Sequence, residues 1–424
     1  MKKILLGLLI VSSIFATAQK TTVIKCGKLL DTKTGKVVEN QFVLIKSGII
    51  VAVSTTPITA DSLIDLSNYF VMPGMIDAHT HVLLQGDITS EDYDVQVLKE
   101  SIPYRTLRAS KSAEQSILNG FTTIRDLGTE GAGFADVDVK KAINKGVITG
   151  PRMQVATLAM NTTGHYPLKA SDYAWELKFP KGVIEITGAD EARKAVRQQI
   201  EQGADWIKIY ADRGYYKLAD GSFRSLPNFT SDEINAIGDE TIRSRKKLAA
   251  HAMTRDGIIA AINAGAISIE HGSGMDEECM KLMADKGIYW CPTLFVNEYV
   301  AEGRAKMGSM INVYFQQSIE ATFKKAIKMG VKLTYGTDIG GYDWGLPQAK
   351  DFTYFVQWGL TPVQAIQTAT TTAAELLGMQ GKIGEISPGA LADIIAFKKD
   401  PLKDISVLQS VNFVMKEGKV YKHR

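Results

Sequence analysis

The stretch Val71-Met72-Pro73-Gly74-Met75-Ile76-Asp77-Ala78-His79-Thr80-His81 is an apolar run that ends in two histidines one residue apart. Its length and composition are typical of a buried strand. Side chains two positions apart on a strand point to the same side, so His79 and His81 can face one ion. A His-x-His pair also occurs by chance or as a structural pair. The positions of the other histidines distinguish between these interpretations.

Two further histidines occupy the same kind of position. His251 ends the short apolar run 247–251, and His271 ends the run 266–271. Four of the six histidines therefore close strand-like segments. This distribution is hard to assign to chance and favours a shared metal site.

The middle of the chain repeats one pattern, in which a helical segment ends in glycine and an apolar strand follows at once. Glycine just past a helix adopts the left-handed conformation that closes it. Such glycines are Gly120, Gly146, Gly203, Gly265, Gly287 and Gly330. Strands that alternate with helices indicate a parallel sheet.

The expected strands lie near residues 75, 123, 154, 207, 249, 268, 290 and 333. Eight is the number that closes a (β/α)8 TIM-type barrel, an α/β fold. An open doubly wound sheet is the alternative, but no glycine-rich phosphate loop follows the first strand to support it.

The two ends of the chain differ from the middle. Residues 19–72 and 381–424 alternate short strands with turns and contain little helix. Neither end is long enough for a good core of its own. We therefore expect one small β-sandwich domain built from both chain ends, flanking a barrel of residues 73–380.

Residues 1–18 have the features of a secretory signal peptide. Lys2 and Lys3 precede an apolar stretch at 4–15 and the small-residue ending Ala16-Thr17-Ala18. We expect cleavage before Gln19 and a periplasmic or secreted protein. The first residue after the cleavage site is Gln19 and not cysteine, so we expect no lipid anchor.

Charge and cysteine content exclude several function classes. Removing Lys2 and Lys3 lowers the formal charge from +3 to +1, because 47 basic residues then face 46 acidic ones. This balance indicates neither nucleic acid nor an anionic membrane surface as a partner. Cys26, Cys279 and Cys291 are odd in number and suggest buried free thiols rather than a disulfide framework.

In a barrel of this type the active site lies at the carboxyl ends of the strands. Asp338 ends the last expected strand, 331–338, and Lys208 interrupts the apolar strand 205–209. A lysine there is ordinarily a snorkelling or paired core residue. Beside two divalent cations, however, its neutral amine could react with carbon dioxide to form a carbamate, because burial and nearby cations both depress the lysine pKa.

These positions resemble the amidohydrolase superfamily, binuclear-metal subtype, and most of all its secreted imidazolonepropionase-like and Xaa-Pro dipeptidase-like members. The resemblance is carried by the motifs at 73–81, 206–210, 269–272, 336–338 and 384–393. It implies that His79, His81 and Asp338 hold a first metal ion. It also implies that His251 and His271 hold a second, with N6-carboxylated Lys208 as the bridging ligand.

Two positions depart from patterns within the superfamily. Deaminase relatives carry a glutamate three residues after the histidine of the fifth strand, where this chain has Thr254, which argues against deamination. Some prolidase-like relatives carry a tyrosine two residues after that histidine, where this chain has Met253. Xaa-Pro specificity therefore does not follow from the resemblance.

The ligand set indicates the chemistry. Imidazole and carboxylate together suit zinc best, with manganese, cobalt or iron as alternatives. Two such ions share a water and lower its pKa, and the resulting bridging hydroxide would attack an amide carbonyl. Asp338 would take the proton and deliver it to the leaving nitrogen. His165, after the third strand, is a second candidate catalytic residue because a histidine from this loop contacts the scissile carbonyl in similar enzymes.

Candidate substrate-binding residues lie on two loops. Arginines in the loop after Lys208 could bind a carboxylate by bidentate hydrogen bonds, and the glycine-rich aromatic segment 339–345 suits a lid. The candidates are Arg213, Tyr215, Tyr216, Arg224 and Tyr342. Ordinary surface loops are the alternative interpretation of both segments.

Three functions stay open at this point. The first is an exported metal-dependent amidohydrolase that cleaves a C–N amide bond of a dipeptide, N-acyl amino acid or similar small amide. The second is a ring-opening cyclic amidohydrolase acting on a lactam or imidazolone. The third is a non-catalytic metal-binding or ligand-binding barrel. The sequence is compatible with a homo-oligomer and does not decide the oligomeric state.

Overall fold

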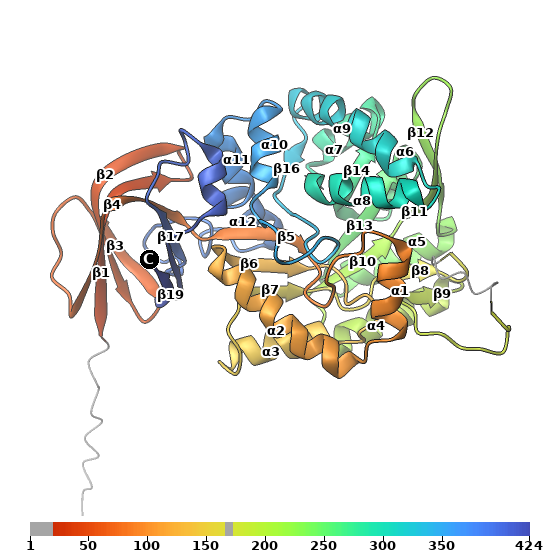
Figure 1. The fold of residues 1–424 in the computed structure, drawn as a ribbon, viewed down its shortest axis with the longest axis horizontal. Helices are drawn as coiled ribbons and strands as arrows, with labels where there is room; N and C mark the ends of the chain where they lie inside the picture. Colours follow the sequence, from red (N-terminus) through yellow and green to blue (C-terminus); the bar gives the residue numbers. More distant parts are fainter. Residues whose placement is uncertain (1–19, 166–172) are drawn as a thin grey trace, which may run out of the picture.

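Eight parallel strands are present at the positions expected from the sequence. This computed structural model describes residues 20–165 and 173–424 (Figure 1). The strands are β5 (Met75–Thr80), β6 (Phe121–Asp126), β7 (Arg152–Val155), β10 (Trp206–Tyr210), β13 (Lys247–Thr254), β14 (Ala266–Gly274), β15 (Tyr289–Cys291) and β16 (Lys332–Leu333). They pair in parallel within two sheets. Two short strands that the sequence did not predict, β8 (Met160–Thr162) and β9 (Ile184–Ile186), extend the larger sheet beside β10.

Backbone hydrogen bonds join the two parallel sheets at both edges. Asp205 N donates to Val155 O at 2.8 Å, which links β7 to the start of β10. Ala78 N donates to Tyr335 O at 3.0 Å, which links β5 to the segment that follows β16. The hydrogen-bonded path thus runs from β5 through all eight strands and back to β5, the connectivity that a (β/α)8 barrel requires.

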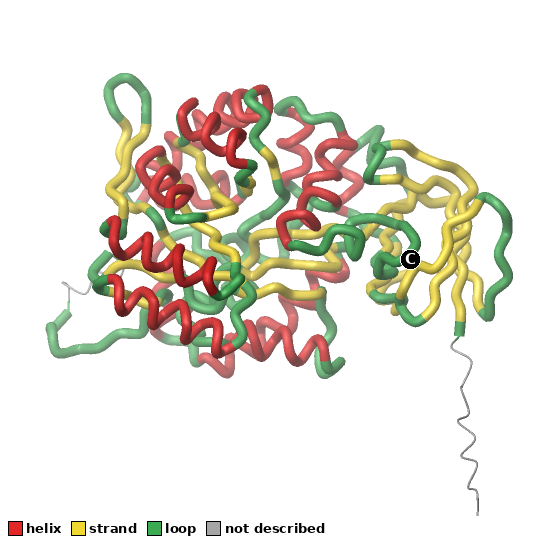
Figure 2. The backbone as a smooth tube through the Cα atoms, turned by 180° about the vertical axis from the view of Figure 1, so that it is seen from behind, coloured by secondary structure: helices red, strands yellow, loops and turns green. Residues whose placement is uncertain are grey.

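Helices lie around these strands, as the ribbon and the rear view show (Figures 1 and 2). Their bounds are α1 (Ser90–Leu98), α2 (Ile102–Leu118), α3 (Ala135–Asn144), α4 (Ala189–Gln202), α5 (Ser231–Arg243), α6 (Arg255–Asn263), α7 (Glu277–Lys286), α8 (Leu294–Lys306), α9 (Ile311–Lys328), α10 (Asp351–Gln357), α11 (Pro362–Thr368) and α12 (Thr371–Leu377). All six glycines expected to close helical segments have positive φ, from 66° at Gly287 to 111° at Gly203. Each therefore turns a helix back toward a strand.

The two chain ends share one sheet. It has the strand order β19-β18-β17-β4-β1-β2-β3. Its strands are β1 (Thr21–Asp31), β2 (Lys36–Lys46), β3 (Ile49–Ser54), β4 (Ser62–Pro73), β17 (Ile394–Phe397), β18 (Phe413–Lys416) and β19 (Lys419–His423). Ile50 N donates to Ala390 O at 2.9 Å, so the edge strand β3 returns to the segment before β17. A single folded-over sheet, rather than two separately paired sheets, therefore encloses the apolar core expected of a sandwich.

The β-rich domain is tied to the parallel strands at Gly74, between β4 and β5. A Cβ atom at Gly74 would lie 2.2 Å from Thr122 Oγ1, so only glycine fits this junction. Arg152 at the start of β7 also donates to Asp393 at 2.7 Å. These contacts fix the strand that carries His79 and His81 against the neighbouring domain.

The signal peptide expected at residues 1–18 lies outside the described residues. Within 20–165 and 173–424, none of the helices combines the length and apolar character needed to cross a membrane. The three cysteines are free and buried, as the sequence indicated.

Candidate metal centre

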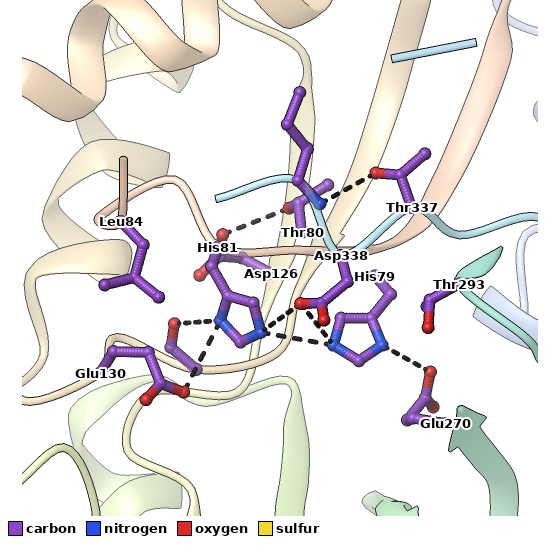
Figure 3. A network of polar contacts seen from close by, with 12 residues as sticks. His79, Thr80, His81, Leu84, Asp126, Glu130, Glu270, Thr293, Thr337 and Asp338 are labelled. Atoms are coloured by element: carbon purple, nitrogen blue, oxygen red, sulfur yellow. Dashed lines mark hydrogen bonds and ion pairs between the residues drawn. The ribbon is translucent and has the colours of Figure 1, made fainter. Parts of the chain in front are cut away.

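His79, His81 and Asp338 converge at the end of β5. His79 Nε2 lies 3.3 Å from His81 Nε2. Asp338 Oδ1 lies 3.2 Å from His81 Nε2 and 3.5 Å from His79 Nε2. These three ligand atoms point at one another (Figure 3) and can hold one metal ion.

Each of these two histidines has its other ring nitrogen held by the protein. Nδ1 of His79 donates to Glu270 Oε2 at 3.0 Å, and Nδ1 of His81 donates to the carbonyl oxygen of Gly128 at 2.8 Å. Metal-binding histidines commonly donate their second ring N–H in this way, which fixes the tautomer and the ring orientation. Both rings therefore present Nε2 to the site.

His251 and His271 complete a contiguous group of four imidazoles. The ring centroids lie 5.1 Å apart for His79 and His271, and 4.6 Å apart for His271 and His251. Nδ1 of His271 is hydrogen-bonded to Thr293 Oγ1 at 2.7 Å. His79 and His81 are buried, whereas His251 and His271 are partly exposed, so this side of the group is the more accessible one.

Beyond the effect of burial, Lys208 lies close enough to His79, His251 and His271 for its charge to lower their pKa values. It is 1% exposed and lies within β10, two residues before Tyr210, which pairs with His251. Burial lowers the pKa of Lys208, and the positive charge of Arg125 lowers it further, against the opposing charges of Glu270 and Asp338. A lowered pKa exposes the neutral amine that carbamate formation requires.

The charges of the site favour a cation beside Asp338. Burial alone would raise the pKa of Asp338, but His79 and His81 outweigh it and lower that pKa. Burial alone would lower the pKa of His81, but the hydrogen bond and charge of Asp338 raise it to about 9. For His79 burial dominates, aided by Lys208, and lowers the pKa to about 4. The carboxylate of Asp338 is therefore ionised, and the imidazole of His79 is neutral.

Glu270 is a functional residue that the sequence analysis missed. Both Glu270 and Arg125 are fully buried, and Arg125 donates to Glu270 Oε1 at 2.9 Å. Ser268 donates to the same oxygen, while the second oxygen holds His79 (Figure 3). The sequence did contain a signal for this pair, because Arg125 and Glu270 are charged residues inside the apolar strands β6 and β14.

The backbone is strained at several residues of the site. Positive φ occurs at Asp338 (60°), His271 (69°), Thr293 (46°) and Glu130 (49°). Such conformations are unfavourable for residues other than glycine and concentrate at functional sites.

Comparison with known proteins agrees with this geometry. The sequence profile of the Amidohydrolase family matches residues 70–421. The chain belongs to the amidohydrolase family. Ochratoxinase from Aspergillus niger is 32% identical over 380 residues, covering 83% of this chain and 75% of ochratoxinase. The resemblance inferred from the sequence motifs is confirmed.

Other relatives cover nearly the whole amidohydrolase chain. The crystal structure of a Xaa-Pro dipeptidase with methionine bound in the active site has a TM-score of 0.83 and 34% identity, covering 95% of this chain and all of that one. Imidazolonepropionase from Alkaliphilus metalliredigens is 23% identical over 433 residues, covering 92% of each chain.

The candidate substrate residues of this amidohydrolase separate in space. The Arg213 guanidinium lies 4.4 Å from the centroid of the Tyr210 ring, which itself packs on His251 with centroids 5.0 Å apart. Arg224 instead forms a bidentate ion pair with Asp256, at 2.7 and 2.6 Å. Tyr216 lies opposite Arg224 in the same hairpin and is 47% exposed. Arg213 is thus the predicted arginine that lies beside the histidines.

Tyr342 and its segment do not form the flexible lid that the sequence suggested. Tyr342 is fully buried, and its ring packs against Phe295 with centroids 4.9 Å apart. Gly86 N donates to Gly340 O at 2.7 Å, and Trp344 Nε1 donates to Leu84 O at 3.1 Å. The segment is therefore packed against the chain that follows His81, and it supports Asp338 instead of covering the site.

His165 follows β8 and is exposed. Its backbone N donates to Thr162 O at 3.3 Å. Its predicted contact with the scissile carbonyl stays a prediction.

Proposed function

We propose that this amidohydrolase cleaves the C–N amide bond of a dipeptide, an N-acyl amino acid or a similar small amide, using two divalent metal ions. The observation that carries this proposal is the convergence of four histidines, each with one ring nitrogen bonded to the protein, on Asp338 and the buried Lys208. We further infer that the eight parallel strands close as a (β/α)8 barrel, which brings their carboxyl ends to this one place.

The donor set fits two metal ions of the zinc type. His79, His81 and Asp338 would hold the first ion, and His251 and His271 the second, with carboxylated Lys208 between them. Two bound ions would lower the pKa of a shared water and polarise the amide carbonyl. Nitrogen and carboxylate donors suit zinc, and also manganese, cobalt or iron.

Asp338 is the proposed proton carrier. Its carboxylate is 16% exposed, and its Oδ1 faces the histidine pair. The lowered pKa keeps the carboxylate ionised, so it can accept the proton of the attacking water. The same oxygen can then deliver that proton to the leaving nitrogen, the usual second half of general acid–base catalysis.

The relatives support a linear amide as the substrate. The Xaa-Pro dipeptidase is named for a linear dipeptide substrate, and ochratoxinase is named for ochratoxin. Arg213 beside Tyr210 and His251 could bind a substrate carboxylate. Because Met253 replaces the tyrosine of some prolidase-like relatives, the proposal does not include specificity for Xaa-Pro dipeptides.

A substrate panel tests the proposal. Protein of measured zinc content is assayed against dipeptides, N-acyl amino acids, their carboxamides, lactams and imidazolones. We expect turnover of linear amides that carry a carboxylate. Turnover of cyclic amides alone would favour the ring-opening function, and no turnover by fully loaded protein would favour a non-catalytic barrel.

We also propose that the enzyme is exported, on the basis of Lys2, Lys3 and the apolar stretch at 4–15. Amino-terminal sequencing of the protein from the periplasm or medium should find Gln19 first. Recovery of the uncleaved chain in the cytoplasm would contradict export.

A further inference from the structure

We propose that Tyr215 is a positioning residue that fixes the ring of His251 as a ligand of the second metal ion. This assignment rests on the proposed two-metal centre. It replaces the substrate-binding role that the sequence suggested for Tyr215, because the hydroxyl group is already engaged on both its donor and its acceptor side.

The hydrogen-bond pattern determines which atom donates. Tyr215 Oη lies 2.9 Å from the carbonyl oxygen of Asp212 and 2.7 Å from Nε2 of His251. A carbonyl oxygen can only accept, and a phenol has a single proton. Tyr215 therefore donates to Asp212, and Nε2–H of His251 donates to Tyr215.

This pattern fixes the tautomer of His251. With its proton on Nε2, the ring keeps its lone pair on Nδ1, which is the nitrogen left for a metal ion. His79, His81 and His271 have the opposite arrangement, because the protein engages their Nδ1 atoms. Tyr215 thus makes His251 the one histidine of the four that presents Nδ1.

An apolar cluster packs against the half-buried Tyr215. Its ring packs against the fully buried Phe315 with centroids 5.8 Å apart, in an apolar cluster that also contains Phe223 and Met253. A phenol restrained by this packing and by its hydrogen bond to Asp212 O can orient the imidazole.

The strand that carries Tyr215 is anchored to the strand that carries His251. Tyr215 lies on β11 (Asp212–Lys217), which pairs with β12 (Phe223–Pro227) in the hairpin that projects from the body in Figure 1. The buried carboxylate of Asp212 accepts hydrogen bonds from Met253 N at 2.9 Å and Thr254 N at 3.1 Å, at the end of β13. Asp212 thus anchors both members of the Tyr215–His251 pair.

The first test measures zinc affinity in Tyr215→Phe. Competition with a chromogenic chelator, in bicarbonate buffer, gives the affinities of both sites. Loss of an outer-shell partner typically weakens metal binding 10- to 100-fold. We expect that loss for the second zinc ion and an unchanged first site. Unchanged affinity at both sites would overturn the proposal.

Tyr335→Phe is the matched control. Tyr335 is fully buried, and its hydroxyl donates to a backbone carbonyl as that of Tyr215 does, here to Gln348 O at 2.8 Å. Its loss should cost comparable stability, measured as the melting temperature, and leave both zinc affinities unchanged. Equal weakening of zinc binding in both variants would overturn the proposal. It would show that Tyr215 affects zinc binding only through the stability of the fold.

The second test needs no metal and leaves Tyr215 unchanged. Long-range ¹⁵N–¹H NMR on the metal-free wild-type protein, with His251→Asn to assign the signals, reports the tautomer directly. We expect the proton of His251 on Nε2, and a proton on Nδ1 would overturn the proposal. A wild-type protein that binds fewer than two zinc ions would instead refute the two-metal function, whatever Tyr215→Phe does.

Discussion

Replacing Glu270 by glutamine tests whether the buried pair of Glu270 and Arg125 stabilises the protein and holds the ring of His79. The glutamine keeps the shape of the side chain and can still accept a hydrogen bond, but it removes the negative charge. Glu270 and Arg125 are both fully buried and lie 2.9 Å apart. Glu270→Gln therefore leaves the Arg125 guanidinium buried without a counter-charge.

The expected loss has two parts. Breaking a buried ion pair from one side costs about 3–5 kcal/mol of unfolding free energy. Glutamine retains part of the hydrogen bonding, so we expect about 3 kcal/mol for Glu270→Gln. In addition, His79 loses the carboxylate that holds its Nδ1–H at 3.0 Å, and affinity at the first metal site should fall roughly 10- to 100-fold.

Urea unfolding of the metal-free protein measures the first part, and chelator competition measures the second. Glu302→Gln is the control, because Glu302 pairs with Lys306 on the exposed side of α8 and should leave both quantities unchanged. The double variant Arg125→Gln, Glu270→Gln removes both charges and should lose less than the sum of the single variants. Wild-type stability and zinc affinity in Glu270→Gln would refute the role assigned to Glu270.

Three further predictions concern the reaction. Lys208→Ala should lose activity and metal, and acetate or propionate with excess zinc should restore part of the activity by replacing the carbamate; a folded variant that is fully active without added acid would exclude the bridge. Asp338→Asn should lower turnover about 10²- to 10⁴-fold while losing far less metal, so turnover near the wild-type level would mean that Asp338 is not the base. Arg213→Met should weaken catalysis on carboxylate substrates and spare their carboxamides, whereas Arg224→Met should affect both alike, because Arg224 pairs with Asp256; equal losses on both substrates in Arg213→Met would assign Arg213 a structural role.

The parallel strands and the histidine positions could be read from the sequence because their signals are local. An apolar run, a closing glycine and a histidine at the end of the run are neighbours in the chain. All six closing glycines adopt positive φ, and the four histidines gather within contact distance.

Contacts between distant segments could not be read in the same way. The Glu270–Arg125 pair joins β14 to β6, and Arg224 forms an ion pair with Asp256, which is 32 positions away in the sequence. Pairings of this kind depend on which elements become neighbours. The hairpin of β11 and β12 escaped prediction because its strands are polar and half exposed.

The prediction of a lid at 339–345 was wrong for a related reason. Glycine and aromatic residues describe the local freedom of the chain, but the hydrogen bonds of this segment go to Leu84, Gly86 and Asp87. Those partners follow β5, and Leu84 lies 260 positions before Trp344 in the sequence. Burial by a distant segment therefore overrode the local signal.

The metal content of the purified protein tests the two-metal centre most directly. Wild-type protein and the double variant His79→Ala, His81→Ala are loaded with zinc in bicarbonate buffer, dialysed against metal-free buffer and analysed for zinc per chain. The proposed ligand set predicts two zinc ions per wild-type chain and loss of the first-site ion in the double variant. One ion or none in the wild-type protein, or two ions retained by the double variant, would contradict it.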